Sequence, residues 1–128
     1  MRNGLLLLLI TLVFSCKKDN TPPELILNSG AGYTSSDITL TAGSTFLVRM
    51  EMTKGKDDLS QYYTEVAYDG TNLPRLVSRN YIGPNDRTHF EKDITVTARN
   101  QPGTERWVFN VNDENGRISK REIHVTVQ

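Results

Sequence analysis

The clearest pattern in the chain is a strict alternation of apolar and polar-rich positions over residues 45–53. Phe46, Val48, Met50 and Met52 fall on one face of an extended chain, and arginine, glutamate and other residues fall between them. A period of two residues is typical of a β-strand, because successive side chains of a strand point to opposite faces of the sheet. We therefore predict a strand here, with one face buried in a core.

Weaker versions of the same pattern recur along the chain, separated by turn residues roughly every 8 to 14 positions. The further strands are predicted at residues 24–28, 37–41, 61–68, 73–78, 90–98 and 106–111, and in a last run that ends at residue 127. Convincing helical periodicity over three turns is absent after the first 23 residues. About seven short strands joined by turns predict an all-β, antiparallel β-sandwich that occupies residues 24–128.

Two of these predicted strands have distinct positions in the sandwich. Trp107, Phe109 and Val111 share one face of their strand, and we expect them to supply the centre of the core. The segment 73–78 contains Pro74 and lies in an arginine-rich stretch, which is typical of an edge strand. The sequence therefore predicts one central strand and one exposed edge.

The end of the chain carries the strongest hairpin signal. Asn115-Gly116 lies between two β-patterned runs, and this dipeptide favours a type I′ turn in which both central residues have positive φ. In the last strand Ile123 falls on the apolar face, whereas Ile118 falls on the opposite parity. We predict a β-bulge near Ser119 that brings both isoleucines inward.

The amino terminus has the pattern of an export signal. Arg2 precedes an apolar run over residues 5–14, which is within the roughly 7 to 15 residues of a signal-peptide core. The run is shorter than the about 20 residues that span a bilayer, and Lys17, Lys18 and Asp19 end it abruptly. We predict a cleaved signal peptide at residues 1–15.

Val13-Phe14-Ser15-Cys16, at the end of this run, resembles the lipobox of bacterial lipoproteins. The resemblance implies a diacylglyceryl thioether on Cys16, cleavage just before it and an acylated new amino terminus. Several acyl chains exceed what lasting membrane attachment requires. Residues 16–23, which end in two prolines, are then a lipidated cysteine and a short stiff tether.

The residues after the cysteine point to a particular group of bacterial lipoproteins. Lys17-Lys18-Asp19-Asn20 is similar to the charged segment that follows the lipidated cysteine in Bacteroidota lipoproteins. The resemblance implies a lipid anchor in the outer membrane. Display at the cell surface and retention on the periplasmic face both remain open.

The rest of the chain resembles the bacterial Ig-like modules of Bacteroidota lipoproteins. The features that carry the resemblance are Pro22-Pro23, Gly30-Ala31-Gly32-Tyr33, Ala42-Gly43, the aromatic strand from Trp107 to Val111, Asn115-Gly116 and the final run from Ile123 to Val127. The resemblance implies an Ig-like β-sandwich. It transfers no binding residues, because it rests on spacing and turn chemistry.

Composition and charge exclude several classes of protein. The chain has 15 basic and 15 acidic residues, so neither a nucleic-acid partner nor a polybasic membrane clamp is indicated. The single cysteine, Cys16, excludes an internal disulfide. Stability must therefore come from packing.

Candidate chemistry is sparse. His89 and His124 are the two histidines, and neither has a second ligand at metal-site spacing. We expect no catalytic residue, no cofactor and no metal. The alternatives are calcium bound by loop carboxylates, and a small envelope hydrolase that uses them for acid-base work; these carboxylates are Asp57, Asp58, Asp113 and Glu114.

The best candidates for recognition are Arg75, Arg79, Tyr81 and Arg87, because arginine and tyrosine anchor interfaces and also bind sugars. The competing interpretation is a charged edge that only prevents sheet-to-sheet aggregation. We expect a non-catalytic, lipid-anchored envelope protein whose Ig-like domain binds a protein or a glycan. A purely structural spacer subunit is the remaining alternative.

Overall fold

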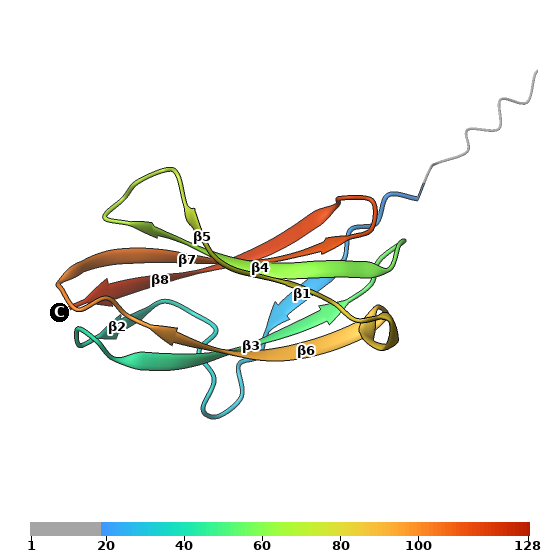
Figure 1. Ribbon diagram of the computed structural model, residues 1–128. Coiled ribbons are helices and arrows are strands. Elements are labelled where there is room, and N and C mark those ends of the chain that lie inside the picture. Colours follow the sequence, from blue (N-terminus) through green and yellow to red (C-terminus); the bar gives the residue numbers. More distant parts are fainter. Residues whose placement is uncertain (1–18) are drawn as a thin grey trace, which may run out of the picture.

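The computed structural model describes residues 19–128, which form a two-layered β-sandwich (Figure 1). The predicted signal peptide, residues 1–15, and the predicted lipid attachment at Cys16 lie outside the described residues. Within residues 19–128, none of the elements is a helix with the length and apolar character to cross a membrane.

The described chain is all-β, as predicted. Its elements are β1 (Glu24–Leu27), β2 (Ile38–Leu40), β3 (Thr45–Thr53), β4 (Leu59–Tyr68), β5 (Arg75–Tyr81), the 3-10 turn η1 (Pro84–Asp86), β6 (His89–Thr97), β7 (Gly103–Asp113) and β8 (Ile118–Val127). The predicted range 45–53 matches β3 at both ends. The described residues hold eight strands, one at each of the eight predicted ranges, although the overall count was put at about seven.

The strands form two sheets that pack face to face. A three-stranded sheet has the order β1-β3-β6, and a five-stranded sheet has the order β2-β8-β7-β4-β5. This arrangement confirms the predicted Ig-like sandwich. It departs from a purely antiparallel one at a single described pair, because β2 runs parallel to β8.

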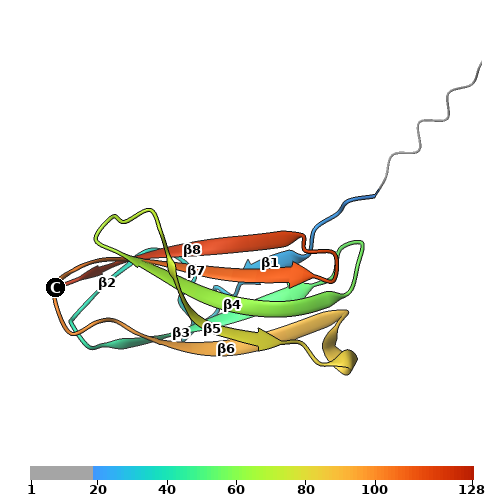
Figure 2. The same cartoon turned by 45° about the horizontal axis from the view of Figure 1, so that its top comes forward.

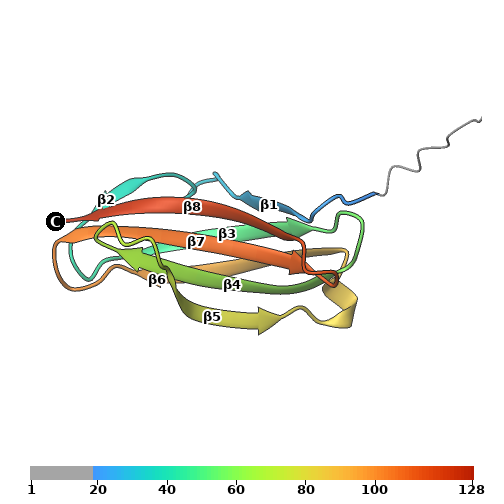
Figure 3. The ribbon, with the colours of Figure 1, turned by 90° about the horizontal axis from the view of Figure 1, so that it is seen from above.

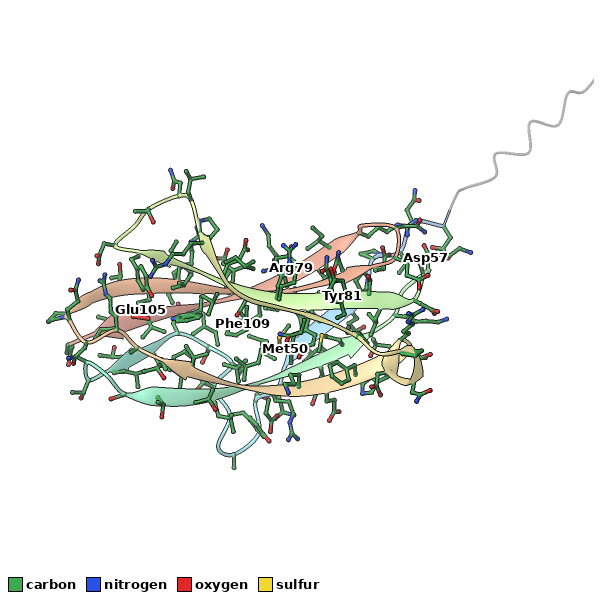
Figure 4. The ribbon with its side chains drawn as sticks, viewed as in Figure 1. Met50, Asp57, Arg79, Tyr81, Glu105 and Phe109 are labelled. Carbon is green, nitrogen blue, oxygen red and sulfur yellow. The ribbon has the colours of Figure 1, made fainter. Side chains whose placement is uncertain are left out.

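The core lies between the two sheets and is built by the predicted alternation. In β3 the four apolar residues of even number are buried, and in β7 Trp107, Phe109 and Val111 are buried. Figure 4 shows Met50 and Phe109 pointing from opposite sheets into this layer. The predicted central strand is therefore confirmed, since β7 is the middle strand of the five-stranded sheet.

The hairpin between β7 and β8 uses a different turn from the one predicted. Gly116 has φ +79°, whereas Asn115 is not among the described residues with positive φ. The Gly116 amide donates to the Asp113 carbonyl at 3.1 Å, so the turn is followed by a glycine in the left-handed region. The type I′ prediction for Asn115-Gly116 is wrong, and positive φ at both central residues occurs instead at Asp69-Gly70.

The predicted bulge near Ser119 is also wrong. The β8 strand pairs with β7 in unbroken register from Ile118 to Val127. Ile118 therefore stays on the outer face, where 52% of it is exposed. The register shifts lie in β4 instead, between Leu59 and Gln61 and between Thr64 and Glu65.

The predicted edge strand is confirmed as β5. It pairs with β4 alone, and all seven of its residues are exposed. Figure 3 shows β5 as the outermost strand of its sheet, beyond β4. Both faces of this strand are therefore open to solvent along its whole length.

Candidate functional site

The two acidic loops named in the sequence analysis meet at one end of the sandwich. Arg117 joins them, because its Nη1 lies 2.5 Å from Asp57 Oδ2 and 3.2 Å from Asp113 Oδ2. The buried Asp113 carboxylate also accepts hydrogen bonds from the backbone N–H groups of Asn115 and Arg117, at 2.9 and 3.0 Å. One arginine thus links the loop before β4 to the loop before β8.

The remaining two carboxylates of these loops also have basic partners. Lys54 Nζ lies 3.2 Å from Asp58 Oδ1, and Arg87 Nη1 lies 3.1 Å from Glu114 Oε1. All four acidic candidates are therefore in ion pairs. Each of the four carboxylates is occupied by a basic side chain, and no two of them form an unoccupied pair that could bind a metal ion or a substrate between them.

The chemistry of this cluster is that of a structural clamp. Among residues 19–128, no three His, Cys, Asp or Glu side chains are grouped so as to hold a metal ion. Hydrogen bonding by the Asn115 side chain, and then by Arg117, holds the pKa of the Asp57 carboxyl below its usual 3.8. A carboxyl with a lowered pKa is a poor proton donor at neutral pH, which disfavours acid-base work here.

The lowered pKa of Asp57 predicts how stability depends on pH. Its contribution to the free energy of unfolding is complete above the unfolded value of 3.8 and is lost as pH falls through the lower folded value. We expect Asp57→Asn to be less stable than the wild type at pH 7. The difference should shrink below pH 3.8, as urea unfolding at each pH would measure. A constant difference down to pH 2 or so would contradict the ion-pair explanation.

The segment that precedes β1 is docked on this same end of the sandwich. Three hydrogen bonds hold it, from Arg117 Nη2 to Asn20 Oδ1 at 3.3 Å, from Lys56 N to Thr21 O at 3.0 Å and from Ser119 Oγ to Pro23 O at 2.5 Å. A Cβ at Gly55 would lie 2.2 Å from the Pro22 carbonyl oxygen, so only glycine permits this approach. Figure 2 shows the chain entering beside the β3–β4 and β7–β8 loops, at the end opposite the carboxyl terminus.

The recognition candidates divide between two places. Arg75, Arg79 and Tyr81 all lie on β5, which extends beyond the predicted edge range 73–78. Arg87 lies apart from them, after the 3-10 turn, where its side chain pairs with Glu114 and its carbonyl oxygen accepts the Leu59 N–H. Arg87 therefore lies outside β5, although sequence spacing had grouped it with that strand.

The two arginines of β5 lie over tyrosines of β4. Arg79 Cζ is 4.9 Å from the centre of the Tyr63 ring, and Arg75 Cζ is 4.9 Å from the centre of the Tyr68 ring. Neither guanidinium forms an ion pair with a carboxylate of residues 19–128. Stacking on a ring orients a guanidinium while it leaves the N–H groups at its rim free to donate.

Exposed apolar side chains gather around the same strand. Of the six large apolar residues that are exposed in the described chain, four lie between positions 73 and 81: Leu73, Leu76, Val77 and Tyr81. Tyr81 is 82% exposed, and Figure 4 shows it on β5 near Arg79. We call Leu73, Arg75, Leu76, Val77, Arg79 and Tyr81 the β5 surface.

Sequence reasoning found the charged and aromatic members of the β5 surface and missed its aliphatic members. Leu73, Leu76 and Val77 follow no clear period, and an aliphatic residue in a predicted strand is ordinarily assigned to the core. The available signal was their position beside Pro74 and two arginines, which already indicated an edge.

A shallow hollow of about 750 Å³ lies away from β5, between β2 and β3. Its lining consists of threonines and apolar residues with one glycine and one tyrosine, and it includes no carboxylate, histidine or cysteine. The hollow therefore offers no carboxylate, imidazole or thiol for catalysis, and we take the β5 surface as the candidate functional site.

Comparison with known proteins assigns no family to the chain. No protein-family model matches the chain, and no curated protein matches it in sequence. Among solved structures, a β-glucosidase from Listeria innocua in complex with gluconolactone is 15% identical with a TM-score of 0.49. The same enzyme in complex with glucose is 14% identical with a TM-score of 0.46. Each match covers 85% of this chain and 16% of the enzyme chain, so the chain spans about a sixth of that length.

Proposed function

We propose that this chain is a non-catalytic, lipid-anchored protein of the bacterial cell envelope, of the Bacteroidota lipoprotein type, whose Ig-like domain binds another envelope or extracellular molecule. The observation that carries the binding role is the β5 surface. It combines four exposed large apolar residues with two stacked arginines that have no ion-pair partner in the described chain. A monomeric soluble domain rarely leaves such a group uncovered without an interaction to make.

The anchoring role rests on the resemblance of the segment ending at Cys16 to a lipobox. The docking of the chain before β1 on the sandwich determines which end of the domain would lie near the anchor. Asp19 is three residues after Cys16, so their Cα atoms are at most about 11 Å apart. The chain is hydrogen bonded to the domain from Asn20 onward. A lipidated Cys16 would therefore keep the Arg117 end of the sandwich close to the membrane surface.

A protein partner fits the β5 surface better than a glycan. Tyr81 and Arg79 suit either, because rings stack on sugars and guanidiniums bind hydroxyls or carboxylates. Leu76 and Val77 are each 51% exposed and are aliphatic, and such side chains gain most from packing against another protein. The spacer alternative assigns no task to these exposed residues.

The anchor is tested by changing Cys16 to alanine in the producing bacterium. We expect incorporation of labelled palmitate to be lost completely and the chain to keep its leader, because only the thiol can form the thioether. A Cys16→Ala protein that still incorporates the label would contradict the proposal. Protease treatment of intact cells then distinguishes surface display from the periplasmic face.

The binding role is tested separately by a photo-crosslinking amino acid at Tyr81 in intact cells. We expect one dominant crosslinked product. A matched crosslinker at Ile26, which is 45% exposed on the other sheet, should not give that product. Equal products from both positions would indicate random collision and would contradict a binding role for β5.

A further inference from the structure

We propose that β5 binds an extended, acidic segment of a partner protein, which adds to the five-stranded sheet as a further strand. The inference rests on the proposed binding role of the β5 surface and goes beyond it by stating how the partner binds and what its chemistry is. Main-chain hydrogen bonds to a sheet edge supply affinity in this mode, and alternate side chains supply specificity.

Comparison of the four sheet edges singles out β5. The edges β1 and β2 are only four and three residues long, which leaves little backbone to pair. The edge β6 is nine residues long and carries Glu91, Lys92 and Asp93, charges of both signs that oppose a neighbouring strand. The seven-residue β5 strand has no acidic residue, and its one register shift, at Val77, leaves a regular stretch from Ser78 to Tyr81 for pairing.

The backbone of β5 has free groups in a regular array. The Ile82 amide donates to the Ser60 carbonyl at 2.9 Å, so position 82 faces β4. Hydrogen bonding toward one neighbour alternates along an antiparallel strand, and the register is continuous from Tyr81 to Ser78. The N–H and C=O groups of Tyr81 and Arg79 therefore point away from β4, toward the free edge.

Charge selects an acidic partner over a second copy of this chain. Between positions 70 and 85 the sequence contains Arg75 and Arg79 and no aspartate or glutamate. Arg79 lies over Tyr63 and Arg75 over Tyr68, and positions 63 and 68 of β4 point to opposite faces of the sheet. A strand with an acidic residue on each face, one beside each guanidinium, would supply the carboxylates that this domain does not. Pairing β5 with its own copy would instead bring two arginines from each chain to one edge, and like charges across a strand pair are destabilising.

The partner also needs aliphatic residues between its acidic ones. Val77 is the unpaired residue at the register shift in the β4–β5 pair, next to Leu76, and a strand beside β5 would bury part of both side chains. An extended segment of β-branched residues with an acidic residue on each face satisfies both requirements. Folded domains that present only a convex charged surface do not.

The direct test uses the mature chain in detergent micelles and a fluorescent seven-residue valine peptide that carries two glutamates three positions apart, so that one lies on each face of the added strand. We expect saturable binding by fluorescence anisotropy. The same peptide with lysine in place of glutamate loses both ion pairs and meets like charges instead, so it should bind about tenfold more weakly. An acidic peptide N-methylated at alternate amides should also lose binding, because it cannot pair with the edge.

Two substitutions at one position separate charge from backbone pairing. Arg79→Ala removes one ion pair and should weaken acidic-peptide binding by about threefold. Arg79→Pro removes that ion pair and also the N–H that faces the free edge, which an edge strand tolerates, and should abolish detectable binding. Ile26→Ala on the opposite sheet is the control and should leave binding unchanged, while thermal unfolding checks that each variant is folded.

Several outcomes would overturn the inference. Equal binding of the glutamate and lysine peptides would remove the charge argument, and equal affinities of Arg79→Ala and Arg79→Pro would remove strand addition. Failure of the peptide to bind, with dimers in sedimentation that Arg79→Pro dissociates, would identify a second copy as the occupant. Each of these results leaves palmitate labelling at Cys16 and crosslinking at Tyr81 as independent tests of the proposed function.

Discussion

Replacing Phe109 by alanine is expected to lower the free energy of unfolding by about 4 kcal/mol, as large-to-small changes of fully buried aromatics do. Phe109 has no exposed surface and lies on the central strand of the five-stranded sheet. The cavity would face Met50 and its neighbours in β3, which are held in a ladder and cannot collapse inward freely. Since small domains are stable by only about 5 to 15 kcal/mol, a large part of the total would be lost.

The matched control for this prediction is Leu76→Ala on β5. Leu76 is 51% exposed and pairs at the edge, so its truncation should cost less than about 0.5 kcal/mol. Urea unfolding followed by the fluorescence of Trp107, the one tryptophan in the chain, measures both changes. Similar unfolding midpoints for the two variants would mean that the layer around Phe109 is not the core of the fold.

The contrast between Phe109 and Leu76 also explains which parts of the fold are predictable from sequence. A sheet with one face in a core imposes a period of two, and this is why the range of β3 and the buried face of β7 follow directly from the sequence. The β5 strand has no buried face, so no period is imposed on it. Only its arginines and the preceding Pro74 indicated an edge, and its aliphatic residues could not be told from core residues.

Turn geometry and the loop cluster depend on contacts that no local pattern records. The Asp113 carboxylate accepts the N–H groups of Asn115 and Arg117, and this favours the observed turn over the type I′ turn that Asn-Gly prefers alone. Arg117 joins Asp57, 60 residues earlier in the chain, only because the two loops share one end of the sandwich. For the same reason sequence spacing could not show that Arg87 pairs with Glu114 of the β7–β8 loop and lies apart from the β5 candidates.

The second large loss of stability is expected from substitution of Glu105, whose side chain points inward because of the alternation of faces along β7. Glu105 lies on the same face as Trp107 and Phe109, so a carboxylate points into the layer between the sheets and is only 1% exposed. Its Oε1 accepts the indole N–H of Trp107 at 2.9 Å, and its Oε2 accepts the backbone N–H of Arg99 at 3.0 Å. Glu105→Ala leaves both donors buried without acceptors and is expected to cost about 3 kcal/mol.

Glu105→Gln tests whether hydrogen bonding is the cause of that loss. The amide of glutamine has one oxygen acceptor, so one of the two donors keeps a partner and the other faces an N–H group. We expect an intermediate cost of about 1.5 kcal/mol. The fluorescence of Trp107 should change in Glu105→Ala, because its indole N–H loses its acceptor. Equal costs for the alanine and glutamine variants would show instead that the negative charge beside Arg99 is what stabilises this end of the sandwich, since both variants remove it.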